Sequence, residues 1–426
     1  MNRILTSILI ISFLTISSHA QKEIEISIGA SYVNQAFYTL KTDSYLDMDN
    51  DSWDIAFALT TSREAGVHIN ESVDLSFTGE AKEVNLFKAP TNEFSDPITD
   101  TEDLEQLYNP DKSWGQGAFN SVQDPANPFD LGWGVVNPAA GKVEGTTVYV
   151  IKLRDDSWKK LMINSFSQGV YNMTYADLDG ANEQTVEIDI KQYNDSHLIL
   201  FSMAQNAVVQ NTPKKWDLFF GRYVSLQNLT GTPTQYNVAG VLSAPGVQVA
   251  QANTLDVDEV KYDEYKDSLS SVIDEIGSDW KFFDFNDGWI INEEVAYFVK
   301  TADNDVYKLV PIEFGGSANG NYVFDLYEIN TSSVKNDQTL FSYFSVSPNP
   351  TSQNQNTNVL FEWDGTQMKG TIQVTDLSGQ RIYLSDINIK RGLNAFEINT
   401  DRLNNGVYNM SIVTSKGIVS DRLIVQ

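Results

Sequence analysis

The sequence predicts a mainly β protein, with two related antiparallel β units, one helix in each, and a small C-terminal β-sandwich. The 426-residue chain contains 19 Tyr and 22 Phe, and aromatic side chains favour pleated surfaces. Landmarks in the middle of the chain occur twice in the same order, and residues 344–426 contain alternating apolar and polar positions. A chain of this length is long enough for about two or three domains with large cores.

Residues 1–20 have the pattern of a signal peptide. Arg3 gives a short positive region, Ile4 to Ile16 form an apolar core, and Ser18-His19-Ala20 is a small-x-small cleavage site. The apolar run is too short to span a bilayer, and no later stretch is long and apolar enough for a transmembrane helix. We therefore expect a mature chain that begins near Gln21 and is soluble and extracytoplasmic.

Composition excludes several functions. The chain has no cysteine, so disulfides, thiolate metal sites and cysteine nucleophiles are ruled out. Its formal net charge is −28, from 57 acidic and 29 basic residues, which argues against binding to nucleic acid or anionic membranes. We interpret the charge as a means of staying soluble outside the cell.

An internal repeat organises the middle of the chain. Trp53-Asp-Ile-Ala-Phe57 recurs as Trp216-Asp-Leu-Phe-Phe220, and Tyr149-Val-Ile-Lys152 recurs as Tyr297-Phe-Val-Lys300. Each Tyr-x-x-Lys motif is followed by an acidic turn and then by a Lys-Leu pair. The two pairs are Lys160-Leu161 and Lys308-Leu309. Several landmarks in one order indicate duplication and predict that both tryptophans fill equivalent cores.

The repeat predicts one unit over residues 27–192 and a second over residues 197–330. Helical spacing of apolar residues predicts a helix over 256–276, and a shorter helix is expected over 101–108. Each helix precedes a polar residue and a tryptophan, so Ser113-Trp114 is expected to be equivalent to Asp279-Trp280.

Four motifs mark the C-terminal region, and residues 331–343 form a polar linker before it. The motifs are Pro348-Asn-Pro350, Asp376-Leu-Ser-Gly-Gln-Arg381, Leu403-Asn-Asn-Gly-Val-Tyr408 and Arg422-Leu-Ile-Val425. Their order resembles the type A C-terminal sorting domain of type IX secretion, and the alternative is an ordinary immunoglobulin-like sandwich. The resemblance implies that residues 344–426 contact the type IX machinery. It also implies export through the periplasm to the cell surface or the medium, often with removal of the domain.

The repeated motifs resemble those of the HmuY-like secreted proteins, and the second unit is the closer match. The match there covers Trp216-Asp-Leu-Phe-Phe-Gly-Arg-Tyr223, Gln235-Tyr-Asn-Val-Ala-Gly-Val-Leu242 and Gly246-Val-Gln-Val-Ala250. The resemblance implies an antiparallel β fold that holds haem iron between two histidines or, in some relatives, methionines. This sequence departs from the family in its length and in lacking an obvious ligand pair.

The candidate haem ligands are few. His68 and His197 are the only histidines of the mature chain, and two axial imidazoles bind haem iron well. Their sequence surroundings are more typical of surface or strand-edge histidines than of haem ligands. Met162, Met173 and Met203 are alternative soft ligands, although isolated methionines usually fill cores.

Asp47, Asp49 and Asp51 have the one-three-five spacing of calcium-loop carboxylates. The pattern fails beyond them, because Ser52 replaces the glycine and Ala58 stands in place of the closing glutamate. A solvated turn is the simpler interpretation, and the three residues remain a weak calcium candidate.

The sequence favours a secreted binding protein over an enzyme. It contains no Gly-x-Ser-x-Gly elbow, phosphate-binding loop or dinucleotide fingerprint, and no carboxylate pair stands out for glycoside hydrolysis. The first hypothesis is a haem or tetrapyrrole binder with a β-lined pocket. The alternative is a structural, adhesive or glycan-binding surface protein that does not bind haem, and a hydrolase is a distant third.

Overall fold

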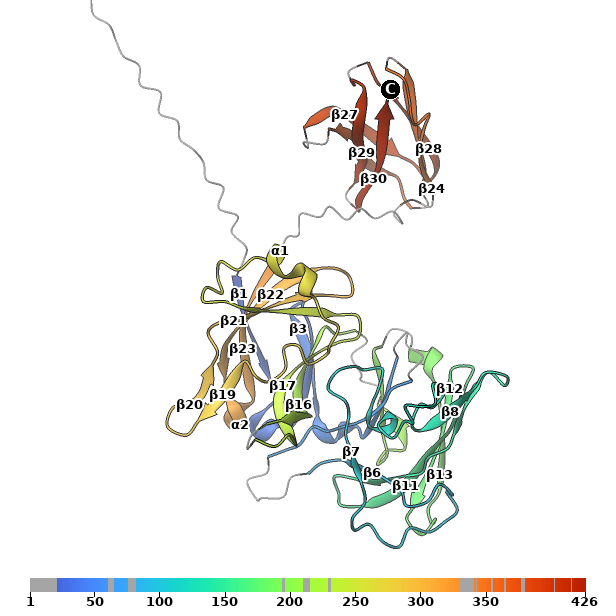
Figure 1. Cartoon of the computed structure of the whole chain (residues 1–426), viewed down its shortest axis with the longest axis vertical. Coiled ribbons are helices and arrows are strands. Elements are labelled where there is room, and N and C mark those ends of the chain that lie inside the picture. The colour runs from blue at the N-terminus through green and yellow to red at the C-terminus, as the bar shows by residue number, and fades with distance from the viewer. Residues whose placement is uncertain are drawn as a thin grey trace, which may run out of the picture. The chain divides into compact units, whose positions relative to one another are not determined.

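The computed structural model divides the chain into two compact units, with the division between Asn330 and Thr331 (Figure 1). The described residues are 21–59, 65–75, 82–193, 196–209, 215–228, 231–329, 341, 343–353, 355–363, 365–376, 380–401, 403–414 and 416–426. The expected signal peptide and most of the expected linker lie outside them. The prediction of a mainly β chain is confirmed: within these residues the α-helices are α1 (Tyr262–Tyr265) and α2 (Gly316–Asn319). None of the described helices is long and apolar enough to cross a membrane.

The first unit consists of two β lobes. The first lobe, β4 to β15, has a four-stranded sheet in the order β15-β14-β4-β5 and a larger sheet built on β13-β12-β11-β10-β6-β7. Its strands are β4 (Ile55–Ala58), β5 (Val67–Ile69), β6 (Asn85–Lys88), β7 (Gln106–Leu107), β8 (Gly134–Asn137), β9 (Lys142–Gly145), β10 (Tyr149–Lys152), β11 (Trp158–Ser167), β12 (Val170–Asp177), β13 (Gln184–Asp189), β14 (Leu198–Ser202) and β15 (Ala207–Val208).

The second lobe, β1 to β3 with β16 to β23, has corresponding sheets in the orders β17-β16-β2-β3 and β1-β23-β22-β21-β18, with the hairpin β19-β20 beside them. Its strands are β1 (Gln21–Ser27), β2 (Asn34–Thr39), β3 (Ser44–Asp49), β16 (Leu218–Gln227), β17 (Thr234–Ser243), β18 (Gln248–Asn253), β19 (Lys281–Asp284), β20 (Gly288–Ile291), β21 (Val295–Lys300), β22 (Val306–Phe314) and β23 (Asn321–Ile329). One core cluster contains side chains of both lobes, including Ala56, Leu200 and Leu218.

The two lobes share the same strand pairing. Tyr149 pairs with Leu161 in the first lobe, and Tyr297 pairs with Leu309 in the second. The next strand pair is interrupted by a bulge at the same place in each lobe, after Ile163 and after Pro311. The repeated landmarks therefore mark equivalent strands.

The first three strands of each repeat are exchanged between the lobes. In chain order, β1 to β12 form the first repeat and β13 to β23 the second. However, β1 and β2 pair with β23 and β16 of the second repeat, whereas β13 and β14 pair with β12 and β4 of the first. The register is the same in both lobes, because Tyr38 pairs with Leu218 as Phe201 pairs with Ile55.

The Trp-Asp motifs fix this exchange. Asp217 donates its backbone N–H to the Tyr38 carbonyl, and its carboxylate accepts the Leu40 N–H at 2.8 Å. In the other lobe Asp54 donates to the Phe201 carbonyl, and its carboxylate accepts the Met203 N–H at 2.7 Å. Each tryptophan before these aspartates is buried, as predicted from the repeat.

The expected boundaries at 27–192 and 197–330 approximate the two repeats in sequence, but the sheets divide the chain differently. Strands β1 to β3 belong to the second lobe, so the first lobe starts near Trp53. The first lobe is thus inserted between two segments of the second.

The two expected helices are wrong. Residues 106–107 form β7, which pairs with β6, and Asp103 before it has a positive φ of 58°. Over 256–276 the only helical turns are α1 and the 3-10 turn Lys266–Ser268. Ser270 instead exchanges backbone hydrogen bonds with Val249, so the apolar residues of this segment cover sheet edges in an extended conformation.

The structural counterpart of Trp280 is Trp133, not Trp114. Trp133 and Trp280 each precede a hairpin, β8-β9 or β19-β20, and both are fully buried. The Trp133 carbonyl accepts an N–H from Thr146 just after its hairpin, and the Trp280 carbonyl accepts one from Asn292. Trp114 lies outside this correspondence.

The second compact unit is a sandwich of a three-stranded sheet, β24-β25-β28, and a four-stranded sheet, β27-β26-β29-β30. Its strands are β24 (Tyr343–Ser347), β25 (Asn356–Trp363), β26 (Met368–Thr375), β27 (Arg381–Ile389), β28 (Gly392–Asn399), β29 (Gly406–Thr414) and β30 (Gly417–Val425). Asn349 ties the Pro-Asn-Pro motif to the last strand, because its amide donates to the Arg422 carbonyl and accepts the Ile424 N–H. Residues 377–379 of the expected turn lie outside the described residues.

We predict that Trp216→Ala lowers the free energy of unfolding by about 3–5 kcal/mol, as large aromatic truncations in cores do. Trp216 is 2% exposed and packs against Phe37 of the exchanged strand β2. Chemical denaturation of both proteins measures the difference. Phe285→Ala is the matched control, because Phe285 is 96% exposed and its loss should change stability by less than about 0.5 kcal/mol. Equal losses in both variants would contradict the core role of Trp216.

Candidate functional site

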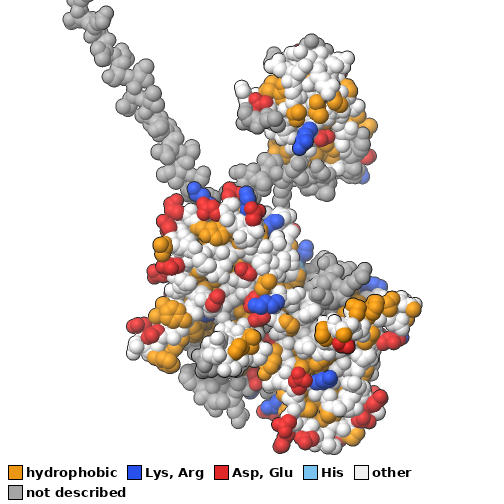
Figure 2. Space-filling model, in the orientation of Figure 1, with side chains coloured by type: hydrophobic (Ala, Val, Ile, Leu, Met, Phe, Trp, Pro, Cys, Tyr) orange, Lys and Arg blue, Asp and Glu red, His pale blue; other side chains and the backbone are white. Residues whose placement is uncertain are grey.

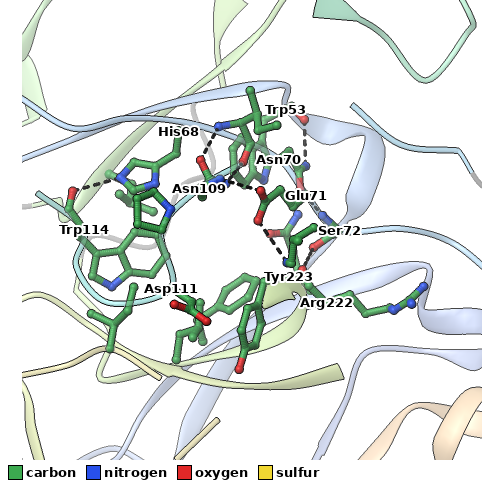
Figure 3. Close-up of a pocket in the computed structure, with 18 of the residues that line it drawn as sticks. Trp53, His68, Asn70, Glu71, Ser72, Asn109, Asp111, Trp114, Arg222 and Tyr223 are labelled. Carbon is green, nitrogen blue, oxygen red and sulfur yellow. Dashed lines mark hydrogen bonds between the residues drawn. The ribbon is translucent and has the colours of Figure 1, made fainter. Parts of the chain in front are cut away.

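A cavity of about 50 Å³ lies where the two lobes of the first unit meet (Figure 3). The exchanged strand β2 contributes Gln35 and Phe37, the segment after β5 contributes Asn70 to Ser72, and β16 contributes Tyr223. Aromatic and aliphatic side chains form most of the wall. Figure 3 shows His68 and Trp114 on one side of the opening, with Glu71 and Asn109 opposite Tyr223.

Two buried polar side chains of this wall have atoms without a hydrogen-bond partner. Gln35 is 0% exposed, and neither its amide oxygen nor its amide nitrogen is paired. Trp53 is 6% exposed, and its indole N–H is also unpaired. Burial of such groups without partners costs about 1–3 kcal/mol each, because their bonds to water are lost. A ligand or water in the cavity would restore these bonds.

The duplication gives an internal comparison for the polar wall. The position equivalent to Gln35 is Leu198. Gln35 lies three residues before Tyr38, which pairs with the residue after Trp216-Asp217, and Leu198 lies three residues before Phe201, which pairs with the residue after Trp53-Asp54. His68 is likewise equivalent to Leu242, because they pair with Ala56 and Phe219 at matching positions. Both leucines line the same cavity. Leucine therefore satisfies the fold at these positions, and Gln35 and His68 are polar for another reason.

Glu71 is the buried acid of the site, with 7% of its surface exposed. Its carboxylate accepts the Asn109 N–H at 2.7 Å and the Val224 N–H at 3.2 Å, so it links the two lobes. Burial raises the pKa of Glu71 to about 8. Asp111 also lines the cavity, and its carboxylate accepts the Ser225 hydroxyl and lies 3.5 Å from the Lys112 ammonium.

Of the two expected haem ligands, His68 lines the cavity and His197 lies against the Trp216 ring. His68 Nε2 donates to the Trp114 carbonyl at 3.0 Å, and burial lowers the pKa of His68 to about 4. A chain of ring contacts runs from His68 to Trp114 (5.3 Å), from Trp114 to Trp216 (5.7 Å) and from Trp216 to His197 (5.5 Å). The two imidazoles are thus connected through the rings of Trp114 and Trp216.

The other predicted ligands are dispersed. Met173 and Met203 are buried in the core of the first lobe, and Met162 packs against a separate small cluster there. Asp47 and Asp49 are exposed on β3, and Asp51 is exposed in the turn that follows. Among the described residues, no group of three or more histidines and acids is placed to hold a metal ion. The calcium site stays a prediction.

A second, more polar cavity of about 190 Å³ adjoins the first. We call it the outer cavity and the first one the inner cavity. Ile69, Glu71 and Val224 line both. The remaining outer lining is Glu83, Val84, Asn85, Gln106, Tyr108, Gln235 and Asn237. The amide oxygen of Asn237 is buried and unpaired, as are the Gln35 amide atoms in the inner cavity.

Sequence reasoning missed Gln35, Glu71 and the outer cavity. One signal was present for Gln35: the spacing that separates Trp53 from Trp216 also separates Gln35 from Leu198. The repeat thus aligns a polar residue with an apolar one inside a strand. Glu71 gives no such signal, because only the folded chain places it between the lobes.

The comparisons identify the C-terminal region. Residues 345–426 match the family described as the secretion system C-terminal sorting domain. The protein is therefore exported by type IX secretion, to the outer cell surface or beyond it. No curated protein matches the chain. The resemblance to the HmuY-like proteins is not confirmed by these matches.

Three solved structures illustrate the remaining similarity. Apo PinO from Porphyromonas gingivitis is 10% identical, with 73% of this chain and 98% of that chain covered and a TM-score of 0.23. A polysaccharide lyase is 7% identical, with 88% and 46% covered and a TM-score of 0.16. Dimeric latent PorU from Porphyromonas gingivalis is 9% identical, with 95% and 34% covered and a TM-score of 0.17. All three TM-scores are below 0.5, so none of these similarities supports a shared fold or function.

We predict that deletion of residues 344–426 abolishes export. The deletion removes the sorting domain together with the Asn349 contacts that join its first motif to its last strand. The truncated protein should accumulate in the periplasm, as measured by immunoblotting of periplasmic, surface and medium fractions. The same fractions of a strain with the full chain serve as the control. Normal amounts of the truncated protein outside the cell would contradict the prediction.

We predict that Gln35→Leu raises the free energy of unfolding of the ligand-free protein by about 1–3 kcal/mol, because it removes two unpaired buried polar atoms. The reciprocal variant Leu198→Gln should lower it by a similar amount. Chemical denaturation measures both. Destabilisation by Gln35→Leu would show that the amide is satisfied in the folded protein.

Proposed function

We propose that this exported protein is a binding protein, not an enzyme, and that it holds a small organic ligand in the cavities between its two lobes. The observation that carries the proposal is the buried, unpaired amide of Gln35 at a position where the other repeat has leucine. Ligand sites combine apolar walls with a few well-placed polar groups. The inner cavity has this composition, and Gln35 and Trp53 supply its unpaired polar groups.

The sizes of the two cavities indicate how a ligand would be placed. The inner cavity holds a group of a few heavy atoms, and the outer cavity has room for the rest of the molecule. Glu71 faces both cavities and is held by one backbone N–H from each lobe. We infer that ligand binding stabilises the contact between the lobes.

Haem binding remains a prediction of the HmuY-like resemblance, and the geometry does not favour it. Typical cofactor pockets have volumes of about 300–1,000 Å³, larger than either cavity. Ligation of haem iron through His68 Nε2 would also break the hydrogen bond from this atom to the Trp114 carbonyl.

An adhesive or glycan-binding role is the second candidate, and a specific observation favours it. Phe282, Phe283 and Phe285 are more than half exposed on the hairpin β19-β20, and Phe283 contacts the Trp289 ring. Figure 2 shows hydrophobic side chains gathered over this end of the second lobe. Aromatic surfaces of this kind stack against sugars. Unchanged cell adherence and glycan binding in a Phe283→Ala, Phe285→Ala variant would remove this candidate.

The binding proposal is tested with acetamide, which is small and carries a hydrogen-bond donor next to an acceptor. We expect saturation-transfer NMR to detect acetamide on the full mature chain and to lose most of the signal with Gln35→Leu. Gln251→Leu is the matched control, because Gln251 lies on β18 and lines neither cavity. An acetamide signal of equal size in all three proteins would refute the proposal.

Haemin titration tests the resemblance on the same preparation. We expect no saturable low-spin spectrum, because His68 Nε2 is bonded to the Trp114 carbonyl and both cavities are smaller than typical cofactor pockets. A sharp Soret band that changes with both His68→Ala and His197→Ala would show that the core rearranges and that haem is a ligand.

A further inference from the structure

We propose that the interlobe site recognises a primary α-ammonium group next to a carbonyl group. This chemistry occurs in a free amino acid amide and at the amino terminus of a peptide. The inference rests on the proposed function, because it names the ligand class of the same site. Three independent features of the site support it: the charges around the inner cavity, the unpaired atoms in its wall, and the outer cavity.

The charges around the inner cavity favour a cation. Glu71 and Asp111 are the acids of its lining. Arg222 is its basic residue, but the guanidinium donates to the Val73 and Asn237 carbonyls and extends away from the opening (Figure 3). Lys112 does not line the cavity and bonds to Asp274 at 2.6 Å. Glu71 has no cationic partner among the groups that line the cavity, so an ammonium beside it would favour its ionised form and be attracted to it.

The aromatic wall also suits an ammonium group. Trp53, Trp114 and Tyr223 surround the opening in Figure 3. The faces of such rings attract cations, and the attraction is stronger when water is excluded. A carboxylate ligand would instead meet Glu71, Asp111 and the negative faces of these rings.

The unpaired atoms require more than an ammonium. The Gln35 oxygen can accept an N–H from the ligand, but the Gln35 nitrogen and the Trp53 indole nitrogen are both donors. A simple alkylammonium would leave these two donors without an acceptor. A carbonyl oxygen next to the ammonium can accept from them, so this pair of groups matches every unpaired polar atom in the inner wall.

The outer cavity fits the rest of a peptide-like ligand. Its lining contains four side-chain amides, from Asn85, Gln106, Gln235 and Asn237. The unpaired Asn237 oxygen can accept an N–H from the group that follows the carbonyl. Backbone amides alternate donors and acceptors, and side-chain amides present the same two groups.

The site also predicts how binding depends on pH. Burial holds the pKa of Glu71 at about 8 in the empty site, and an adjacent ammonium would lower it, because opposite charges stabilise each other. Binding should therefore strengthen as pH rises towards about 8 and release a proton below it. Above about 8 the α-amino group of the ligand loses its charge and binding should weaken.

His68, Tyr223 and Arg222 do not produce this dependence. His68 is neutral throughout this range, since its pKa is about 4, and burial keeps the pKa of Tyr223 well above its usual value. Arg222 stays protonated and is bonded to backbone carbonyls. Asp111 lies beside Lys112 and accepts the Ser225 hydroxyl.

The experiment compares glycinamide with N-acetylglycinamide, in which the ammonium is removed, by calorimetric titration of the full mature chain at pH 6, 7, 8 and 9. We expect glycinamide to bind at least about tenfold more tightly, with an optimum near pH 8. Glu71→Gln and Asp111→Asn should each weaken glycinamide binding. Asp284→Asn is the control and should leave glycinamide binding unchanged, because Asp284 is half-buried on β19 and lines neither cavity. Thermal melting checks that each variant is folded.

Glycylglycinamide distinguishes the two sources of this chemistry. Tighter binding than glycinamide indicates a peptide amino terminus that extends into the outer cavity, and weaker binding indicates a free amino acid derivative. If acetamide binds as tightly as glycinamide, the ammonium inference fails and the binding function stands. If neither binds, the inner cavity holds water only, and both proposals fail.

Discussion

The exchange of strands between the two repeats depends on one type of contact, an aspartate carboxylate that accepts a backbone N–H from the opposite repeat. Asp217 holds Leu40 in this way, and Asp54 holds Met203. Each contact places a buried tryptophan beside the foreign strand and completes a four-stranded sheet. Burial raises the pKa of both aspartates, because desolvation disfavours the charged carboxylate. The hydrogen bond from the backbone N–H favours the charged form and offsets part of this cost. The core that spans both lobes is built on these two junctions.

The sequence predicted the elements that the repeat marks, because a repeated Trp-Asp strand or Tyr-x-x-Lys strand must bury the same side chains twice. It could not predict which repeat supplies the partner strand. Strand β2 pairs with β16 through backbone groups, and its sequence contains no landmark shared with β14. The expected helix over 256–276 failed for a related reason, since apolar residues at helical spacing can also lie in an extended segment along sheet edges. Here the backbone of Ser270 bonds to Val249, and the Ile273 carbonyl accepts the Ser243 N–H.

The candidate site was harder to predict than the fold. Histidines and methionines are rare and chemically distinctive, so the sequence suggested them as ligands. In the fold, Met173 and Met203 are core residues, and His68 donates a hydrogen bond to the Trp114 carbonyl. The informative residue is Gln35, whose significance comes from its environment: a fully buried amide without partners, at a position where the duplicate has Leu198. In a duplicated fold, the residue at the equivalent position of the other repeat shows whether packing alone would require a polar side chain there.

The strand exchange also explains why the cavity lies between the repeats. Gln35 and Phe37 reach it on β2 and Trp53 follows them in the first repeat, whereas Tyr223 and Leu242 come from β16 and β17 of the second. Without the exchange, β2 would pair within its own repeat, as β14 would, and the two sets of residues would not share one wall. Glu71 adds a direct link, because it accepts one N–H from each lobe. A ligand that pairs with Glu71 of the first lobe and Gln35 of the second therefore contacts both lobes, and its binding energy contributes to the same interface that the Trp-Asp contacts establish.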